Sequence, residues 1–471
     1  MTHTLLMIFV MLLPLIGSLF VLSAKDREGS SSNAFNVALM TLIVNICLTV
    51  GLFRFLPLNA SAELKVIWTF SPSVDFAFGA DILSLIFMLG LQISMLVGIL
   101  GIKKDKMPSK NLLFNVLVYT ALLNGYFLSR DLLSFYICFA GMLAPLYMLI
   151  LSGLSPSKHK ILEHLMMHYF LSAMLFLASL VMIFCLTQSN VLIARLPDLV
   201  FSHKKSIMVW GGLFMALILR VPVWPFHHTI ISVSNAIKNP LVFIALNILP
   251  LGGIYAFMRF WPLVIPFEIA ILSPVFQGLC VVTMIFAAFG GYAHPSAGHK
   301  LYHYIFVYDL LYLLAVFLPT NVIEFNIAYS VFAFMIISAG LVILQAHMSR
   351  QSSKLSSGIK GILCHMPRTS MVYALFVLAA VGLPISAFFW NNFVIIAEMF
   401  DFGLYTGTVV VISVTVAAVS MLENLYTLRV ETCALSDEIH IKDLDAITFS
   451  VLILLMFALM LSFFKPLWFV V

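Results

Sequence analysis

Charged residues are scarce in this sequence. Of the 471 residues, 10% are Asp, Glu, Lys or Arg, whereas 62% are hydrophobic. The core of a soluble protein of this length could not bury that share of apolar side chains, so the composition excludes a soluble enzyme. It predicts an all-α polytopic membrane protein, because helices satisfy their own backbone hydrogen bonds within a bilayer.

The sequence also lacks the patterns that hold cofactors. Its six cysteines are scattered, and no two have the spacing of metal ligands. No haem or iron–sulfur motif, glycine-rich nucleotide loop or nucleophile–base pair is present. We therefore expect no metal or cofactor in this chain, and any redox centre to belong to a partner. The net charge of +5 is too small to indicate nucleic acid.

Long apolar runs dominate the chain. A helix needs about 20 apolar residues to cross the hydrocarbon layer of a bilayer. Runs of that kind predict about fourteen transmembrane helices in one membrane domain, residues 1–471. The expected spans are 4–23, 35–55, 78–101, 111–128, 131–152, 162–187, 206–222, 240–259, 265–290, 301–318, 323–347, 370–400, 403–428 and 445–468.

Two of the expected spans are interrupted by proline. Pro222 and Pro225 follow the seventh span, and Pro384 lies inside the twelfth, where a missing backbone donor breaks the helix. The two broken spans are five apart, which is the pattern of inverted repeats that enclose a site near the bilayer midplane. We expect the repeats at about 111–259 (helices four to eight) and 265–428 (helices nine to thirteen).

The distribution of basic residues predicts the orientation. Loops after odd-numbered spans hold 16 of the 25 Lys and Arg residues, and loops after even-numbered spans hold 7. The excess places the odd-numbered loops in the cytoplasm or organelle matrix. With an even number of spans, both termini are then expected on the non-cytoplasmic side.

The most informative stretch surrounds the first break. It reads Arg220-Val-Pro-Val-Trp-Pro-Phe-His227-His228 between two apolar runs. A cation just before a helix break and two imidazoles just after it fit a polar site inside a membrane bundle. The alternative is an ordinary loop, with the Arg220 side chain reaching the lipid headgroups.

The same stretch resembles a known motif. It is similar to the Lys-x-Pro-x-x-Pro-x-His motif of the antiporter-like subunits of respiratory complex I, in which the lysine of a broken seventh helix is the central proton-handling residue. Further stretches resemble that family in the same order along the chain. They begin at Gly79, Asp131, Leu251, Ser338 and Leu378. The chain length and the number of spans favour the M-type subunit, also known as mitochondrial subunit 4.

This sequence departs from the family at the positions that carry protons. The resemblance places the family's helix-five Glu, helix-seven Lys, helix-eight Lys, helix-eleven His or Lys and helix-twelve Glu on Ala140, Arg220, Leu251 (or Pro250), Phe334 and Asn392. Arginine stays protonated, so it replaces a switchable charge with a fixed one. The other four residues cannot titrate. We therefore expect the usual Lys/Glu relay to be largely replaced.

Other ionisable groups lie in or near the expected spans. The candidates for a substitute proton pathway are Arg220, His227, His228, His303, Asp309, Glu398 and Glu423. The alternative for each is a structural role, with its charge or hydrogen bonds satisfied by a neighbour. His164 and His168 have a metal-compatible i, i+4 spacing, but the sequence offers no third ligand.

The resemblance implies a non-catalytic membrane-arm subunit of a complex I-like NADH:quinone oxidoreductase, in a bacterial or mitochondrial inner membrane. Its family role would be proton translocation coupled to quinone reduction, beside other membrane subunits. Quinone, FMN and iron–sulfur clusters would be held only by partner subunits. Three alternatives stay open: the membrane subunit of a two-component inorganic-carbon uptake transporter, a subunit of a cation/proton antiporter or membrane-bound hydrogenase, and a non-transporting scaffold.

Overall fold

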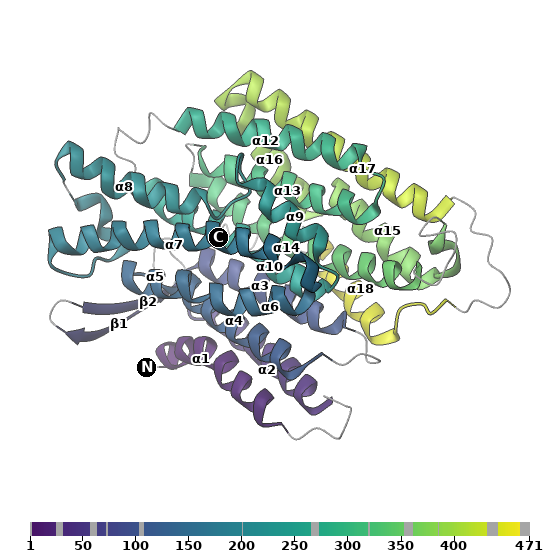
Figure 1. The fold of residues 1–471 in the computed structure, drawn as a ribbon, viewed down its shortest axis with the longest axis horizontal. Helices are drawn as coiled ribbons and strands as arrows, with labels where there is room; N and C mark the ends of the chain where they lie inside the picture. The colour runs from purple at the N-terminus through teal and green to yellow at the C-terminus, as the bar shows by residue number, and fades with distance from the viewer. Residues whose placement is uncertain are drawn as a thin grey trace. The chain divides into compact units, whose positions relative to one another are not determined.

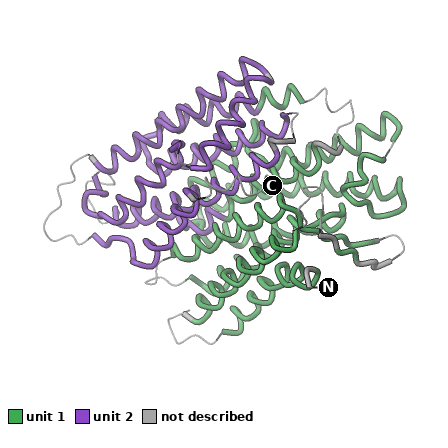
Figure 2. Tube along the Cα trace, turned by 180° about the vertical axis from the view of Figure 1, so that it is seen from behind, with its two compact units in different colours: residues 1–237, 245–279 green, residues 238–244, 280–471 purple. Residues whose placement is uncertain are grey.

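The computed structural model of this chain is built almost entirely from helices (Figure 1). It describes residues 2–24, 32–56, 64–71, 74–102, 108–199, 201–264, 273–318, 321–352, 361–384, 386–430 and 441–461. These residues form two compact units, which Figure 2 colours separately. Unit 1 comprises Met1–Ile237 and Ala245–Leu279, and unit 2 comprises Lys238–Ile244 and Cys280–Val471.

Unit 1 contains one hairpin among its helices. Its elements are α1 (Thr2–Ser23), α2 (Ser32–Phe53), β1 (Leu64–Ser71), β2 (Val74–Ala80), α3 (Ile82–Leu100), α4 (Lys110–Leu128), α5 (Leu132–Gly141), α6 (Leu143–Gly153), α7 (His159–Thr187), α8 (His203–Ile218), α9 (His227–Ala236) and most of α10 (Pro240–Val264). Helix α1 packs against α2 and α4, and α7 packs against α8.

Unit 2 is helical throughout its described residues. Its elements are most of α12 (Ser273–Ala293), α13 (Ala297–Val316), α14 (Asn321–Ser352), α15 (Pro367–Val381), α16 (Ala387–Phe402), α17 (Leu404–Val430) and α18 (Ala446–Leu461). Helix α13 packs against α14 and α17, and α16 packs against the same two helices.

The helical membrane fold is confirmed. Ten helices of the described chain are long and apolar enough to cross a membrane, and two shorter apolar helices accompany them. The count of fourteen spans and the two inverted repeats stay predictions. Both proline breaks are present, since α8 ends at Ile218 before α9, and α15 ends at Val381 before α16.

The third span was predicted to begin too early. Its predicted start is residue 78, but β1 and β2 form an antiparallel hairpin that reaches Ala80, and α3 begins only at Ile82. Both strands are rich in aromatic and β-branched residues, a local signal for extended structure. The apolar character of β2 had made it look like the first turn of the helix.

A proline in the first helix explains a polar cluster inside unit 1. Pro14 has no N–H to donate to the carbonyl of Val10, one turn earlier in α1. Two asparagines on neighbouring helices donate to that carbonyl instead, Asn45 Nδ2 at 3.1 Å and Asn124 Nδ2 at 3.0 Å. Gln92 Nε2 then donates to the side-chain oxygens of both asparagines, at 2.6 and 3.2 Å. The network ties α1, α2, α3 and α4 together.

We expect Asn124→Ala to lower the free energy of unfolding by about 0.5–2 kcal/mol, because a hydrogen bond between membrane helices contributes about that much to stability. Pro14→Ala restores a backbone donor to the Val10 carbonyl, so the double variant should lose less than the two single variants summed. Denaturant unfolding of the wild type, both single variants and the double variant in one detergent completes this double-mutant cycle. Strict additivity would contradict the capping role of Asn124.

The break in unit 2 has a helix-ending glycine. Gly382 adopts φ +100°, a left-handed conformation that favours glycine, and its N–H donates to the Ala379 carbonyl. The next N–H, that of Leu383, donates to Leu378 at 3.1 Å, so the last turn of α15 is closed. The carbonyl of Pro384 accepts from Trp390 Nε1 at 2.8 Å on α16.

The start of α15 is capped from a distant part of the chain. The Asp443 carboxylate accepts from Arg368 N (2.8 Å), Thr369 N (3.0 Å) and Thr369 Oγ1 (2.6 Å). Burial raises the pKa of the Asp443 carboxyl, but these hydrogen bonds outweigh it and the pKa lies below its ordinary value. A carboxylate at a helix N-terminus also opposes the positive end of the helix dipole.

This cap predicts a pH dependence. Because the folded pKa of Asp443 is the lower one, its contribution to stability is complete above the unfolded pKa of about 4. The contribution is lost as the pH falls through the folded pKa. We expect Asp443→Asn to cost about 1 kcal/mol at pH 7 and much less near pH 3, measured by unfolding at both values. A cost that stays constant with pH would rule out the ionised cap.

Candidate functional site

The break after α8 leaves backbone carbonyls without their usual partners. Pro222 cannot donate to the Ile218 carbonyl, and the Val221 N–H takes that place at 3.2 Å. The Arg220 N–H donates to the Leu217 carbonyl at 3.0 Å, rather than to the Ala216 carbonyl as in a regular α-helix. Ser172 Oγ on α7 donates to the freed Ala216 carbonyl at 2.6 Å, so the broken end of α8 is fastened to α7.

Arg220 lies inside unit 1, with only 2% of its surface exposed. The loop alternative, in which its side chain reaches the headgroups, is therefore wrong. Its Nη2 donates to the Phe139 carbonyl at 2.8 Å, and its Nε donates to Ser172 Oγ at 3.2 Å. The guanidinium carbon lies 3.7 Å from the centre of the Phe139 ring, a cation–π contact.

The carbonyl that Arg220 binds lies at a second break. The predicted span 131–152 is divided into α5 and α6 at Met142, and Pro145 follows without an N–H. Phe139 therefore lies in the last turn of α5, where carbonyls lack helical partners and the helix dipole is negative. Arg220 thus connects two broken helices through its guanidinium group.

Four of the five residues that are predicted to stand in place of the family's titratable groups are apolar or amide; the fifth is Arg220. Leu251 and Phe334 are fully buried, and Phe334 packs against the rings of Tyr304, Tyr308 and Tyr312. Asn392 is also buried. Ala140 follows the residue whose carbonyl binds Arg220, and among the described residues no carboxylate forms an ion pair with Arg220.

The two imidazoles after the break differ in exposure. His227 is the first residue of α9 and is half-buried, whereas the side chain of His228 is exposed. The His228 carbonyl accepts from Ser232 Oγ at 2.8 Å within the same helix. Of the three ionisable residues in this stretch, Arg220 is thus buried in unit 1 and His227 is buried in part, whereas His228 is exposed.

Unit 2 holds the other four candidates. His303 is half-buried on α13, and its Nδ1 lies 2.9 Å from the His299 carbonyl. Glu423 on α17 is 48% exposed and pairs with the buried Lys300 at 2.7 Å, which is the structural role that the sequence left open. Glu398 is half-buried on α16. Within the described residues, none of these candidates forms a hydrogen bond or ion pair with another or with Asp309.

Asp309 is the exceptional carboxyl of unit 2. Asp131 and Asp309 are the two buried carboxyls in the described part of the chain, each 1% exposed. Asp131 accepts from the backbone N–H groups of Ala77 (2.7 Å) and Ser134 (2.8 Å) and from Asn190 Nδ2 (2.8 Å). Neither carboxyl oxygen of Asp309 has a hydrogen-bond partner among the described residues.

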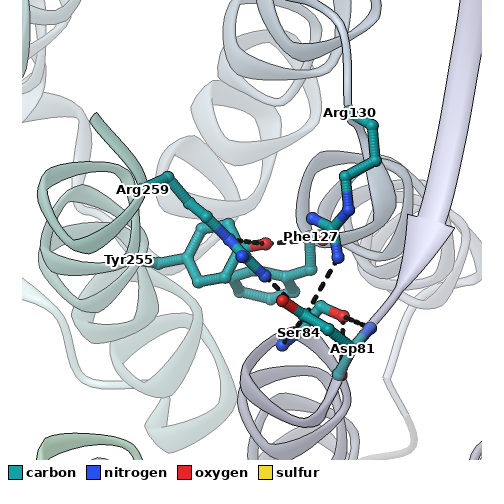
Figure 3. Close-up of polar contacts among 6 residues, drawn as sticks. All are labelled: Asp81, Ser84, Phe127, Arg130, Tyr255 and Arg259. Carbon is teal, nitrogen blue, oxygen red and sulfur yellow. Dashed lines mark hydrogen bonds and ion pairs between the residues drawn. The ribbon is translucent and has the colours of Figure 1, made fainter. Parts of the chain in front are cut away.

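A cluster of three charged residues in unit 1 was not predicted from the sequence. Arg259 Nη2 lies 2.5 Å from Asp81 Oδ1, and Arg130 Nη2 lies 2.9 Å from the same oxygen (Figure 3). Tyr255 accepts from Arg259 Nε at 3.0 Å and donates to the Phe127 carbonyl at 2.6 Å. Asp81 also caps α3 through Ser84 N. All three charged residues lie in or beside stretches that resemble the family. This position was the feature of the sequence that could have identified them.

This cluster fastens three distant segments of unit 1. Burial raises the pKa of the Asp81 carboxyl, but Arg259, Arg130 and the Ser84 N–H outweigh burial and hold this pKa well below its usual range. The carboxylate is therefore ionised throughout the physiological range. It joins the start of α3, the α4–α5 connection and the end of α10.

A helical membrane unit with a buried cation at a proline-broken helix is what the resemblance to the antiporter-like membrane subunits predicts. Residues 129–418, more than half of the chain, match the family described as NADH:quinone oxidoreductase/Mrp antiporter, TM, and the chain belongs to that family. The predicted resemblance is thereby confirmed.

Curated relatives match along most of the chain. NADH-ubiquinone oxidoreductase chain 4 of Marchantia polymorpha is 23% identical over 422 residues, which cover 87% of this chain and 83% of the relative. NADH-quinone oxidoreductase subunit M of Rickettsia prowazekii is 23% identical over 472 residues, covering 94% and 92%.

Solved structures share the fold. A chain of respiratory complex I from Thermus thermophilus aligns with a TM-score of 0.85 at 20% identity, covering 98% of this chain and 96% of that chain. A chain of the archaeal membrane-bound sulfane sulfur reductase gives 0.82 at 14% identity, covering 96% and 75%. One from the Mrp complex of Dietzia sp. DQ12-45-1b gives 0.79 at 14%, covering 98% and 50%.

Proposed function

We propose that this chain is a membrane-arm subunit of a complex I-like NADH:quinone oxidoreductase and takes part in proton translocation there. The observation that carries the proposal is the match to subunit M and chain 4 relatives over most of both lengths. NADH oxidation and quinone reduction would occur in partner subunits, which would hold the FMN, the iron–sulfur clusters and the quinone. The chain would lie in an inner membrane, with both termini on the non-cytoplasmic side.

In this proposal Arg220 is a fixed charge rather than a proton carrier. An arginine in a protein keeps its proton, so it influences nearby titrations by its field without exchanging protons itself. The proton would instead use groups that titrate. Asp309 is the first candidate because it is buried without a partner in the described chain, and His227, His228, His303, Glu398 and Glu423 follow.

A non-transporting scaffold is the second candidate function. It is favoured by the apolar or amide residues at four relay positions, three of them buried. The membrane subunit of an inorganic-carbon uptake transporter would share the fold, and its partner would be a single large zinc protein.

The experiment begins with purification of the tagged protein in mild detergent and identification of its partners by mass. NADH-module and quinone-module subunits support the proposal, whereas a single zinc protein contradicts it. The purified complex is then reconstituted, and protons moved per NADH oxidised are measured. Asp309→Asn should lower this ratio without changing NADH oxidation, and exposed Glu163→Gln on α7 is the control. A ratio unchanged by every candidate substitution would favour the scaffold.

A further inference from the structure

Arg220 differs from the other buried cations of the described chain. The buried cations are Arg130, Arg220 and Lys300. Arg130 pairs with Asp81, and Lys300 pairs with Glu423. Arg220 has a carbonyl, a hydroxyl and an aromatic face, and no carboxylate partner among the residues that the structure describes. A buried charge without a counter-charge is costly by several kcal/mol.

One guanidinium nitrogen remains available. The buried Nη1 of Arg220 has no hydrogen-bond partner in the described part of the chain, although Nε and Nη2 both donate. Arg220 lines a small cavity of about 10 Å³, room for about one water-sized molecule, together with His168, Tyr169, Phe226 and Thr229. The buried Nδ1 of His168 also lacks a partner among the described residues.

We propose that this cavity binds a small monovalent anion as the counter-ion of Arg220. The guanidinium supplies a permanent positive charge, and its Nη1 and the His168 imidazole supply hydrogen-bond donors with no other partner in the described chain. A monovalent anion neutralises the single charge, whereas a divalent anion would leave an excess negative charge in an apolar site. The cavity has room for about one water-sized molecule, which restricts the anion to a halide or an ion of similar size.

The proposal gives the missing family carboxylate a replacement. A glutamate at position 140 would be a permanent counter-charge, whereas a diffusible anion is present in proportion to its concentration. The inference concerns the site of the proposed function but is tested on the isolated chain. Failure of anion binding therefore leaves the proposed place in an oxidoreductase intact, and failure of the partner experiment leaves the anion site intact.

The first test compares thermal unfolding of the purified full chain in sodium chloride and in sodium gluconate at constant ionic strength. Above the dissociation constant, Tm should rise by about 1 °C for each tenfold increase in chloride. Arg220→Gln should abolish the rise, and exposed Arg195→Gln should retain it although it removes the same charge. A wild-type Tm that is independent of chloride overturns the proposal.

The second test locates the ion and does not depend on the stability of an arginine variant. In crystals grown with sodium bromide, the anomalous signal should show a bromide within about 3.5 Å of Arg220 Nη1. His168→Phe keeps the Arg220 charge and removes one donor, so the chloride concentration for half-saturation should increase several-fold. Bromide bound only elsewhere, or unchanged chloride binding in both Arg220→Gln and His168→Phe, overturns the proposal.

Discussion

Asp81→Ala is expected to lower the free energy of unfolding by about 3–5 kcal/mol, because removing one partner leaves buried charges uncompensated. Two guanidinium groups share this carboxylate, Arg259 at 2.5 Å and Arg130 at 2.9 Å. The substitution also removes the cap of α3 at Ser84 N, which is worth about 1 kcal/mol of this sum. Denaturant unfolding of the purified chain in one detergent measures the loss.

Two matched variants separate these contributions. Asp81→Asn keeps an acceptor for Ser84 N and removes the charge, so it should lose most of the stability that Asp81→Ala loses. Glu163→Gln removes the same charge from an exposed position on α7 and should change stability by less than about 0.5 kcal/mol. If Asp81→Asn were as stable as the wild-type protein, the ion pairs would have no net stabilising role.

The helix breaks could be predicted because their causes are local. Pro222, Pro225 and Pro384 each remove a backbone donor, and the consequence follows from the residue itself. The division between α5 and α6 was not predicted, because Pro145 follows it inside a continuous apolar run; Leu132–Gly153 as a whole has the length and hydropathy of one span. Hydropathy reports the length of a span and carries no information about its continuity.

The partners of the buried charges could not be predicted, because they are distant in sequence. Asp81 and Arg259 are 178 residues apart, and Lys300 and Glu423 are 123 apart. The pairing of Glu423 with Lys300 depends on the packing of α13 against α17, which the sequence does not reveal. The resemblance predicts that Ala140 stands where the family has a carboxylate, but the Phe139 carbonyl that binds Arg220 becomes available only through the unpredicted break.

Replacement of Asp309 is expected to change the free energy of unfolding by a similar amount, but to raise it rather than lower it. Its carboxyl is buried without a partner in the described chain, a state that costs about 1–3 kcal/mol even when the group is neutral. Replacing it with an apolar residue of similar size removes that cost. We therefore expect Asp309→Leu to raise the free energy of unfolding by about 1–3 kcal/mol, measured by denaturant unfolding.

The control is the same substitution at Asp131, the other buried carboxyl of the described chain, and it should destabilise the protein. Asp131→Leu leaves the Ala77 and Ser134 N–H groups and Asn190 without their acceptor, so it should destabilise the chain by several kcal/mol. If Asp309→Leu were equally destabilising, Asp309 would be a satisfied structural residue and its place as first candidate for proton transfer would be lost. If the Asp309→Leu variant is more stable than the wild type and its complex translocates fewer protons per NADH oxidised, Asp309 lowers stability but is needed for activity. That combination is typical of a functional residue.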